Sequence, residues 1–223
     1  MAADYATSTA KYFEVGEKIT EEEMQNYLLS SKKKTAPGVS GIPIEMWVHG
    51  TERTKAELLD LLNQCLESTQ VPSQWLYRLI RPLAKTEAAV GLSDIRPITL
   101  LEVSQKILTG ILTKRIMDVW SEHQVLHPWQ MAFLDGKGCV QALERLRGIL
   151  ADCRDSTNKK ECHMLFLDLA KAYDSVEYWA LEDAMRGIGI PENVLTVMRN
   201  LDERAQAKVL LRRNSVAVLS YYC

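Results

Sequence analysis

The sequence predicts a helix-rich α+β fold with small antiparallel β pieces. Apolar residues recur at helical spacing in several stretches, and two pairs of short extended segments flank turns at residues 86–93 and 213–214. No repeat or low-complexity tract interrupts the chain. The 223 residues, of which 47% are hydrophobic, are enough for one large domain or two small ones with a sizeable core.

The N-terminal part is predicted to contain a lead-in, one capped helix and a loop. Residues 1–17 are expected to form the loose lead-in. Thr20 and Glu23 have the spacing of a capping box, which predicts a helix from Thr20 to about Ser30. Residues 31–43 are rich in lysine, proline and glycine, so they are predicted to form a loop.

A second helix and a hairpin are predicted next. Thr54 and Glu57 have the spacing of another capping box, and the apolar residues behind it fall on one helical face. The segments from Tyr77 to Ala84 and from Ile95 to Leu101 are predicted to be extended. Together they indicate a β-hairpin with basic residues at its base.

Longer helices and a second hairpin are predicted in the rest of the chain. A helical period starts at Val103 and ends before His127, and another helix is predicted over about residues 138–152. Residues 207–211 and 216–221 flank a turn and predict the second hairpin. The tryptophans are expected to fill the core or to pack between helices. They are Trp47, Trp75, Trp120, Trp129 and Trp179.

Residues 163–169 are predicted to form a buried strand that carries one carboxylate near its end. The stretch is apolar apart from His163 and Asp168. Asp174 is predicted to be the N-cap of the next helix, with Glu177 reaching back, and this helix ends at the glycines of residues 187–189.

Composition limits the classes of function. The net charge of -2 and the isoelectric point near 6.1 argue against a strongly basic nucleic-acid-binding protein, but they average over faces and are compatible with local basic patches. The five cysteines include no Cys-x-x-Cys pair, so we expect reduced thiols in an intracellular protein and no zinc site. No signal peptide or apolar run of about 20 residues is present, and no membrane contact is expected.

The Asp168 side chain is the first candidate for chemistry. A carboxylate at the end of a buried strand is costly unless it is paired, capped or bound to a cation. Magnesium prefers hard oxygen ligands, and two-metal phosphoryl transfer uses carboxylates to hold its ions. The alternative is an aspartate that caps a helix or lies in a loop, and the stretch alone leaves both open.

Several stretches, taken in order, resemble one family. The stretch "LDLAKAYDSV" is similar to the first catalytic motif of reverse transcriptases, particularly those of non-LTR retrotransposons. Five further stretches resemble family segments in the family's order. They are "KKKTAPGVSGIP", "VPSQWLYRLIRPLAK", "DIRPITLLEVSQKILTGILTKRI", "QMAFLDGKGCVQAL" and "LEDAMRGIGIPENVLTVMRNL". The resemblance covers roughly residues 18–223, and its strength lies in the order of the motifs, since each alone is weak.

The resemblance implies a fold and a function. It implies part of a right-hand polymerase, with a fingers-like region over residues 18–160 and a partial palm over residues 161–223. The full-length form would be an RNA-directed DNA polymerase that uses an RNA template, a DNA primer and deoxynucleoside triphosphates, with Mg²⁺ or Mn²⁺ as cofactor. A retroelement enzyme would act in the nucleus, although the sequence shows no import signal.

The resemblance also implies roles for single residues. Asp168 matches the catalytic aspartate that bridges both metal ions, and the backbone carbonyl of Leu169 is a further metal ligand. Tyr173 matches the aromatic gate that excludes the ribose 2′-hydroxyl. Lys85 and Arg96 match the cations that hold the incoming triphosphate, for which the planar fork of arginine is well suited.

Other residues are assigned less specifically. Gln130 and Phe133 match a segment near the template and the nucleotide. Lys32, Lys33 and Lys34, together with Lys137, are weak candidates for nucleic-acid contacts, and a solvated run of charge is an equal explanation for the three consecutive lysines. The spacing of Asp168 and Asp174 is also found in RNA-dependent RNA polymerases, a less favoured alternative because the neighbouring motifs match the retroelement pattern.

The chain departs from the family pattern at several positions. Ser40 stands where the family usually has aspartate, Ala132 where it has glycine, and Leu134 and Lys137 where it has arginine. The later Gly-x-x-Gln-Gly and aromatic-x-Asp-Asp motifs do not occur in these 223 residues. We therefore expect the chain by itself to lack polymerase activity, and we expect self-association or a partner that supplies the missing palm and thumb.

Three hypotheses follow from the sequence. The chain is a fragment of a retroelement reverse transcriptase, or it is an inactive remnant that acts at most as a nucleic-acid- or protein-binding module. An unrelated helical interaction domain is the third hypothesis, and the six ordered motifs argue against it.

Overall fold

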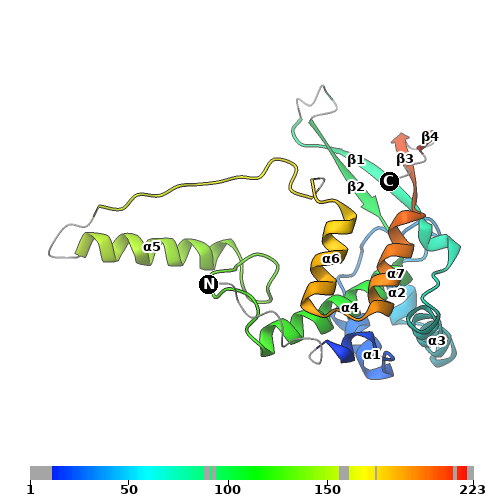
Figure 1. Ribbon diagram of the computed structural model, residues 1–223. Helices are drawn as coiled ribbons and strands as arrows, with labels where there is room; N and C mark the ends of the chain where they lie inside the picture. Colours follow the sequence, from blue (N-terminus) through cyan, green and yellow to red (C-terminus); the bar gives the residue numbers. More distant parts are fainter. Residues whose placement is uncertain are drawn as a thin grey trace. The chain divides into compact units, whose positions relative to one another are not determined.

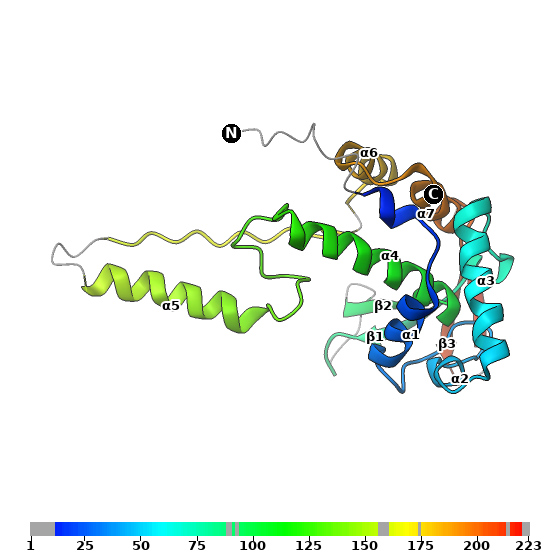
Figure 2. The ribbon, with the colours of Figure 1, turned by 90° about the horizontal axis from the view of Figure 1, so that it is seen from below.

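The computed structural model describes residues 12–87, 91, 94–155, 161–173, 175–212 and 215–219. The chain divides into a larger compact unit, within Met1–Ile116 and Glu182–Cys223, and a smaller one, Met117–Leu181 (Figures 1 and 2). Asp174, which we expect to be an N-cap, lies outside the described residues. In the described part of the chain, no helix is long and apolar enough to cross a membrane.

Helices form the core of the larger unit. Its elements are η3 (Phe13–Gly16), α1 (Glu21–Ser30), α2 (Ile44–Val48), α3 (Glu52–Ser68), η4 (Ser73–Leu76), the part of α4 (Val103–Glu122) up to Ile116, the part of α6 (Tyr178–Ile188) from Glu182, and α7 (Glu192–Glu203). Met24, Leu62, Leu108 and Val194 from four of these helices are fully buried. The apolar periodicity that predicts α3 and α4 therefore marks the faces that meet in this core.

The capping box predicted at Thr20 and Glu23 is confirmed. The backbone N–H of Thr20 donates to Glu23 Oε2 at 2.9 Å, and the N–H of Glu23 donates to Thr20 Oγ1 at 3.2 Å. The box predicted at Thr54 and Glu57 is wrong. Helix α3 starts one turn earlier, because Thr51 Oγ1 accepts the N–H of Thr54 at 3.2 Å and so caps the helix itself.

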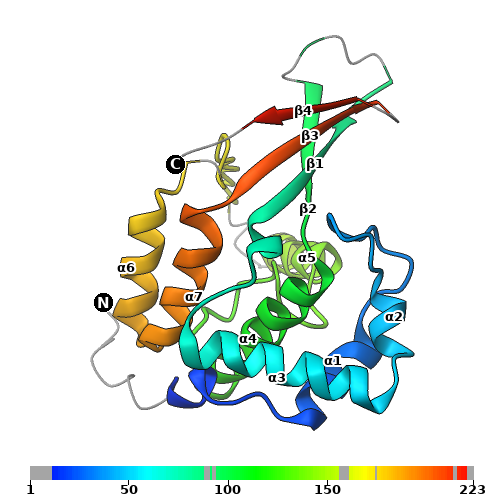
Figure 3. The same cartoon turned by 90° about the vertical axis from the view of Figure 1, so that its right-hand side faces the viewer.

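The strands form one sheet in the larger unit. They are β1 (Tyr77–Ala84), β2 (Ile95–Leu100), β3 (Gln206–Arg212) and β4 (Ser215–Leu219), in the order β2-β1-β3-β4. Figure 3 shows the strands running away from the helices. Both predicted hairpins are present, but the expected antiparallel pieces are joined by parallel pairing between β1 and β3, which makes the sheet mixed.

Two prolines limit the pairing of this sheet. Pro82 of β1 lies directly opposite Pro97 of β2. Proline has no N–H to donate, so it is tolerated only where a strand has no neighbour on its N–H side. The parallel pairing of β1 with β3 ends at Ile80, just before Pro82, and Pro97 lies on the edge strand β2. Pro82 is therefore tolerated because the β1–β3 ladder ends before it, and Pro97 is tolerated because β2 is an edge strand.

Arg115 holds the N-terminal segment onto α4. Its guanidinium donates to both carboxylate oxygens of Glu23, at 2.7 and 2.8 Å. It also donates to four backbone carbonyls at 2.8 to 3.2 Å. These are the carbonyls of Glu14, Val15, Glu17 and Lys18. Residues 12–17, which we expect to be part of a loose lead-in, therefore pack against the helices, and the Tyr12 side chain is buried.

Gly110 allows α1 and α4 to approach each other closely. The Tyr27 hydroxyl donates to the carbonyl of Lys106 at 3.0 Å, which places the ring over α4. A Cβ at Gly110 would lie 2.3 Å from Tyr27 Cε2 and Oη. The absence of a side chain at position 110 is therefore required by the packing of this ring.

The smaller unit contains α5 (Cys139–Asp155) and an extended segment, residues 161–169, before α6. The strand predicted at residues 163–169 is not formed, and Leu165, Leu167 and Leu169 are exposed. An extended segment is stabilised as a strand only by hydrogen bonds to a neighbour, and this segment pairs with none of the described strands. The apolar composition of residues 163–169 is typical of a strand, but among the described residues the segment has no neighbouring strand to pair with.

The expectation that all tryptophans are internal is wrong for two of them. Trp75 is buried, and its Nε1 donates to Ser104 Oγ at 2.8 Å. Trp129 and Trp179 are 61% and 70% exposed. Both belong to the smaller unit, in which the described residues form no large core.

We predict that Glu23→Gln destabilises the protein in a pH-dependent way. Arg115 lowers the pKa of the Glu23 carboxyl from 4.5 to about 2, so this contribution to stability is complete above pH 4.5 and is lost as the pH falls towards 2. At pH 7 the substitution should lower the free energy of unfolding by about 1–2 kcal/mol, allowing for partial exposure. Urea unfolding from pH 7 to pH 2.5 measures this effect.

The matched control is Glu22→Gln, which changes the same charge in the same helical turn on an exposed side chain. It should have little effect at any pH. A cost of Glu23→Gln that stays constant down to pH 2.5 would contradict the role given to this ion pair.

We also predict that Gly110→Ala destabilises the protein. Alanine replacing glycine inside a helix normally stabilises by about 1 kcal/mol, but here the new methyl group meets the Tyr27 ring, and overpacking costs about 1–3 kcal/mol. Gly148→Ala in α5 is the control, because a Cβ there has nothing within 4 Å. Thermal unfolding should show a lower Tm for Gly110→Ala and not for Gly148→Ala. In a protein that already carries Tyr27→Ala, the further substitution Gly110→Ala should lower the Tm much less. Equal effects of the two glycine variants would refute the steric explanation.

Candidate functional site

A cationic face lies on the β1–β2 hairpin of the larger unit. Leu83 is paired with Arg96, and the N–H of Lys85 donates to the carbonyl of Asp94 at 2.8 Å, which extends the ladder by one position. Side chains alternate along a strand, so Leu83 and Lys85 share a face with Arg96. Lys85 and Arg96 are exposed and diagonal to each other. They lie at the turn end of the hairpin, whereas the sequence analysis expected the basic residues at its base.

Arg81 adds a third cation that the sequence analysis missed. It lies two residues before Leu83 on the same strand, so it shares the face with Lys85 and Arg96, and its side chain is exposed. The alternation Arg81-Leu83-Lys85 within a predicted strand is the signal that would have found it. The same register places one carboxylate, Asp94, opposite Lys85 on this face. Three cations and one carboxylate leave a positive formal charge, which suits a polyanion such as a triphosphate.

Asp168, Leu169 and Tyr173 belong to the smaller unit. All three are exposed, and the Tyr173 side chain is 80% accessible. No group of three or more metal-binding side chains forms among the described residues, so Asp168 is not part of such a group there. A single carboxylate and a backbone carbonyl are fewer ligands than a magnesium ion takes from protein and water, and they do not complete a metal site by themselves.

The loop of residues 127–137 carries Gln130, Phe133 and Lys137. The Gln130 side chain donates to the carbonyl of Ala132 at 3.2 Å, so it is directed at its own loop. Phe133 is 81% exposed and has a left-handed backbone with φ of 61°. Such a backbone is uncommon for a non-glycine residue. The ring of Phe133 is therefore presented to solvent by a locally unfavourable conformation.

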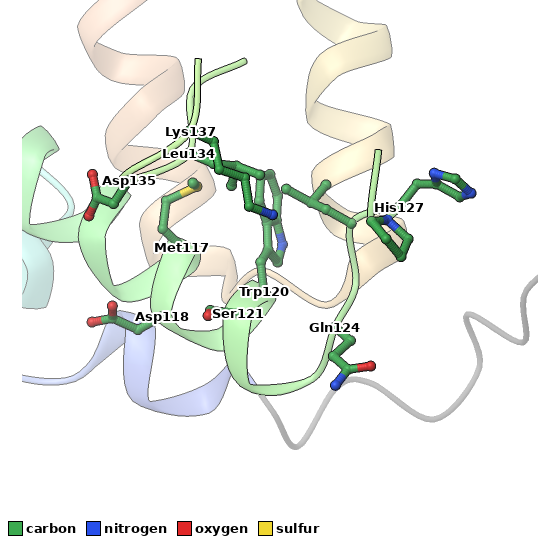
Figure 4. A pocket seen from close by; sticks show the side chains of 11 residues that line it. Met117, Asp118, Trp120, Ser121, Gln124, His127, Leu134, Asp135 and Lys137 are labelled. Carbon is green, nitrogen blue, oxygen red and sulfur yellow. The ribbon is translucent and has the colours of Figure 1, made fainter. Parts of the chain in front are cut away.

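A cavity of about 520 Å³ lies between this loop and the last turns of α4. Figure 4 shows Trp120 and Lys137 directed towards the middle of its lining, whereas Gln124 and His127 point away. The indole Nε1 of Trp120 is buried and finds no hydrogen-bond partner in the described part of the chain. The loop thus forms one wall of a cavity whose lining carries the Lys137 ammonium group together with two carboxylates, Asp118 and Asp135.

The loop of Lys32, Lys33 and Lys34 is held by specific bonds in the larger unit. The backbone of Lys34 is left-handed with φ of 58°, and its N–H donates to Glu45 Oε1 at 2.5 Å. This bond lowers the pKa of Glu45. All three lysine side chains are exposed, so the loop presents them in a fixed backbone conformation.

Ser40 at the end of this loop is bound by a buried carboxylate. Glu102 is 4% exposed, and its two oxygens accept from the N–H and the hydroxyl of Ser40 at 2.7 and 2.6 Å. Glu102 lies between β2 and α4, so this contact links the lysine loop to the end of the cationic hairpin. The bond needs a donor at position 40, which serine supplies.

The predicted site residues are thus divided between the units. Lys85 and Arg96 are brought onto one face of the larger unit, and Lys32 to Lys34 are held in a second part of it. Asp168, Leu169 and Tyr173 follow one another along the exposed segment of the smaller unit, and Gln130 and Lys137 share its loop.

Comparison with known proteins gives a consistent result. Residues 83–213 match the family model described as "Reverse transcriptase (RNA-dependent DNA polymerase)". The match includes Lys85, Arg96, Gln130, Asp168 and Tyr173. Reverse transcriptases in general use divalent metal ions.

Similar curated proteins come from retrotransposons. The chain is 26% identical to the Retrovirus-related Pol polyprotein from type-1 retrotransposable element R2 of Nasonia vitripennis, over 78% of this chain and 16% of that protein. It is 25% identical to the Probable RNA-directed DNA polymerase from transposon BS of Drosophila melanogaster, over 70% of this chain and 17% of that protein. It is 26% identical to the Retrovirus-related Pol polyprotein from type-2 retrotransposable element R2DM of the same species, over 83% of this chain and 16% of that protein.

The chain spans about a sixth of the length of these relatives, which are non-LTR retrotransposon proteins. The family model covers more than half of the chain and includes Lys85 and Arg96 of the hairpin, the loop of residues 127–137 and the Asp168 segment. By this match, the chain belongs to the reverse transcriptase family.

Proposed function

We propose that this chain supplies the nucleotide- and template-binding part of a retroelement RNA-directed DNA polymerase. In this proposal residues 18–160 are the fingers and residues 161–223 the first half of the palm of a right-hand polymerase. The observation that carries it is the cationic face of the β1–β2 hairpin, of which Lys85 and Arg96 lie in the region matched by the family model. RNA template, DNA primer and deoxynucleoside triphosphates are the proposed partners, and the nucleus is the proposed site of action.

The triphosphate is the proposed ligand of the hairpin face. Arg81, Lys85 and Arg96 bring three positive charges to one exposed surface, where the planar guanidinium groups can each pair with two phosphate oxygens. The hairpin is anchored to the helical core through Arg78 of β1, whose Nη2 donates to Asp202 Oδ1 at 3.0 Å and to the carbonyl of Leu201 at 2.7 Å. The cations therefore project from a strand that is fixed at its start.

Asp168 is the proposed catalytic carboxylate, with the Leu169 carbonyl beside it. The described residues do not complete a magnesium site, so a divalent ion would need further oxygen ligands from elsewhere in a full-length polymerase. When bound, such an ion would stabilise charge on the transferring phosphoryl group. The contribution of this chain is one carboxylate on a segment that is accessible to its partners.

Tyr173 is the proposed gate for the sugar. It lies five residues after Asp168, and its exposed ring is free to contact a nucleotide bound near that carboxylate. A ring in contact with the sugar C2′ position leaves room for hydrogen and excludes a hydroxyl group. This selects deoxynucleotides by shape, without a hydrogen bond.

Asp168→Asn tests the catalytic assignment. In the polypeptide encoded by the complete reading frame, the substitution should reduce primer extension on an RNA template to background, because it removes a negative ligand while keeping the shape of the side chain. The control is Asp183→Asn, an exposed aspartate of α6, which should extend primers like the wild type. Full activity of Asp168→Asn would disprove the role, and extension by the 223-residue chain alone would disprove the expected need for further ligands.

Tyr173→Ala tests the gate. The variant should incorporate ribonucleotides much more readily than the wild type, since the ring that excludes the 2′-hydroxyl is gone. Tyr173→Phe keeps the ring and should remain selective for deoxynucleotides. The measurement is the ratio of kcat/KM for matched deoxy- and ribonucleoside triphosphates, and an unchanged ratio in Tyr173→Ala would rule out the gate.

A further inference from the structure

We propose that Trp129, Arg145 and Lys137 form a contact for one nucleotide of single-stranded nucleic acid, with the base stacked on the Trp129 indole. The inference rests on the proposed function, since it names a contact that the template or primer strand would make. It concerns residues outside the hairpin face and the Asp168 segment. The contact is built by the loop of residues 127–137 and the first turns of α5.

The Trp129 side chain is exposed, and Arg145 lies over one face of its ring. The side chain of Trp129 is 61% accessible, and the guanidinium carbon of Arg145 lies 5.7 Å from the ring centroid, within the range of a cation–π interaction. The backbone N–H of Trp129 donates to His127 Nδ1 at 3.2 Å, which restrains the start of the loop. Arg145 covers one face of the indole, and the high exposure leaves the opposite face accessible to a planar ligand.

A cationic hollow lies beside the ring. It has a volume of about 380 Å³ and is lined by Met131, Lys137, Gln141, Glu144 and Arg145. Two cations and one carboxylate give this hollow a positive formal charge. Arg145 belongs to both features, so a phosphate bound in the hollow would lie next to a base stacked on Trp129.

The chemistry of these groups favours a single strand. Proteins that bind single strands combine aromatic side chains, on which bases stack, with cations that follow the phosphates, and arginine adds a cation–π contribution. In a duplex the faces of the bases are covered by their neighbours, so an exposed indole has nothing to stack on. An acidic peptide would use the cations and leave the open face of Trp129 without a partner.

The test is oligonucleotide binding by the full 223-residue chain. Three probes of equal length are used: a single-stranded RNA, an abasic single strand and a duplex. The wild type should bind the RNA best, and Trp129→Ala should weaken that binding by about 5- to 150-fold, the range measured for the loss of one stacked base. Trp129→Phe should keep part of the affinity, and Arg145→Ala should weaken the binding of both single strands.

Trp179 supplies the matched control, since it is a second exposed tryptophan of the smaller unit. Fluorescence quenching by the RNA should be retained in Trp179→Phe and largely lost in Trp129→Phe. Because the Trp129 side chain is exposed, its substitution should leave the urea unfolding midpoint unchanged, which separates a lost contact from a lost fold.

The outcomes distinguish this inference from the proposed function. If the wild type binds RNA and Trp129→Ala binds equally well, the stacking contact is refuted while the proposed function stands. An equal loss for the abasic strand would also refute stacking, because no base is present on it. If the wild type binds none of the probes, both the contact and the nucleic-acid part of the proposed function fail.

Discussion

The arrangement of the larger unit depends on the guanidinium of Arg115. One side chain of α4 satisfies four carbonyls of residues 14–18 and both oxygens of Glu23. These carbonyls belong to η3 and to the residues just after it, and an arginine with its planar set of five N–H donors can reach several of them at once. The α1 helix starts directly after this segment, so its position against α3 and α4 follows from the same contact.

The hairpin and the lysine loop are attached to this helical core by comparable bonds. Arg78 links β1 to the end of α7, and Glu102 links the end of β2 to Ser40. Arg78 donates to a backbone carbonyl and to a carboxylate, and Glu102 accepts from a backbone N–H and a hydroxyl. These bonds are partly buried, and hydrogen bonds to charged groups are strong there. Both anchors lie at the same end of the ladder, where Leu79 pairs with Leu100, so the strands that carry the cationic face are fixed to the helical core at that end.

Sequence reasoning succeeded where the signal is local. The Thr20–Glu23 box, the long period of α4 and the two hairpins depend on residues a few positions apart, and all are found in the structure. The partners of Arg115 are 92 to 101 positions away, and no local pattern indicates them. The segment 163–169 has the composition of a strand, but strand formation also requires a neighbour, and that requirement cannot be read from the segment itself. For the candidate site, the presence of Lys85 and Arg96 on one hairpin was predictable from the sequence. Their diagonal placement, the position of Arg81 and the Arg145–Trp129 contact needed the register and the three-dimensional structure.

The contact between Ser40 and Glu102 explains one departure from the family pattern in physical terms. By the resemblance stated above, Ser40 stands where the family usually has aspartate. Glu102 is buried and already directs both carboxylate oxygens at position 40. A second carboxylate there would face the first at hydrogen-bond distance, and like charges so close cannot both stay ionised without a large cost. Serine instead donates its hydroxyl hydrogen bond to Glu102. Serine at position 40 is therefore compatible with the buried carboxylate and keeps the lysine loop attached to it.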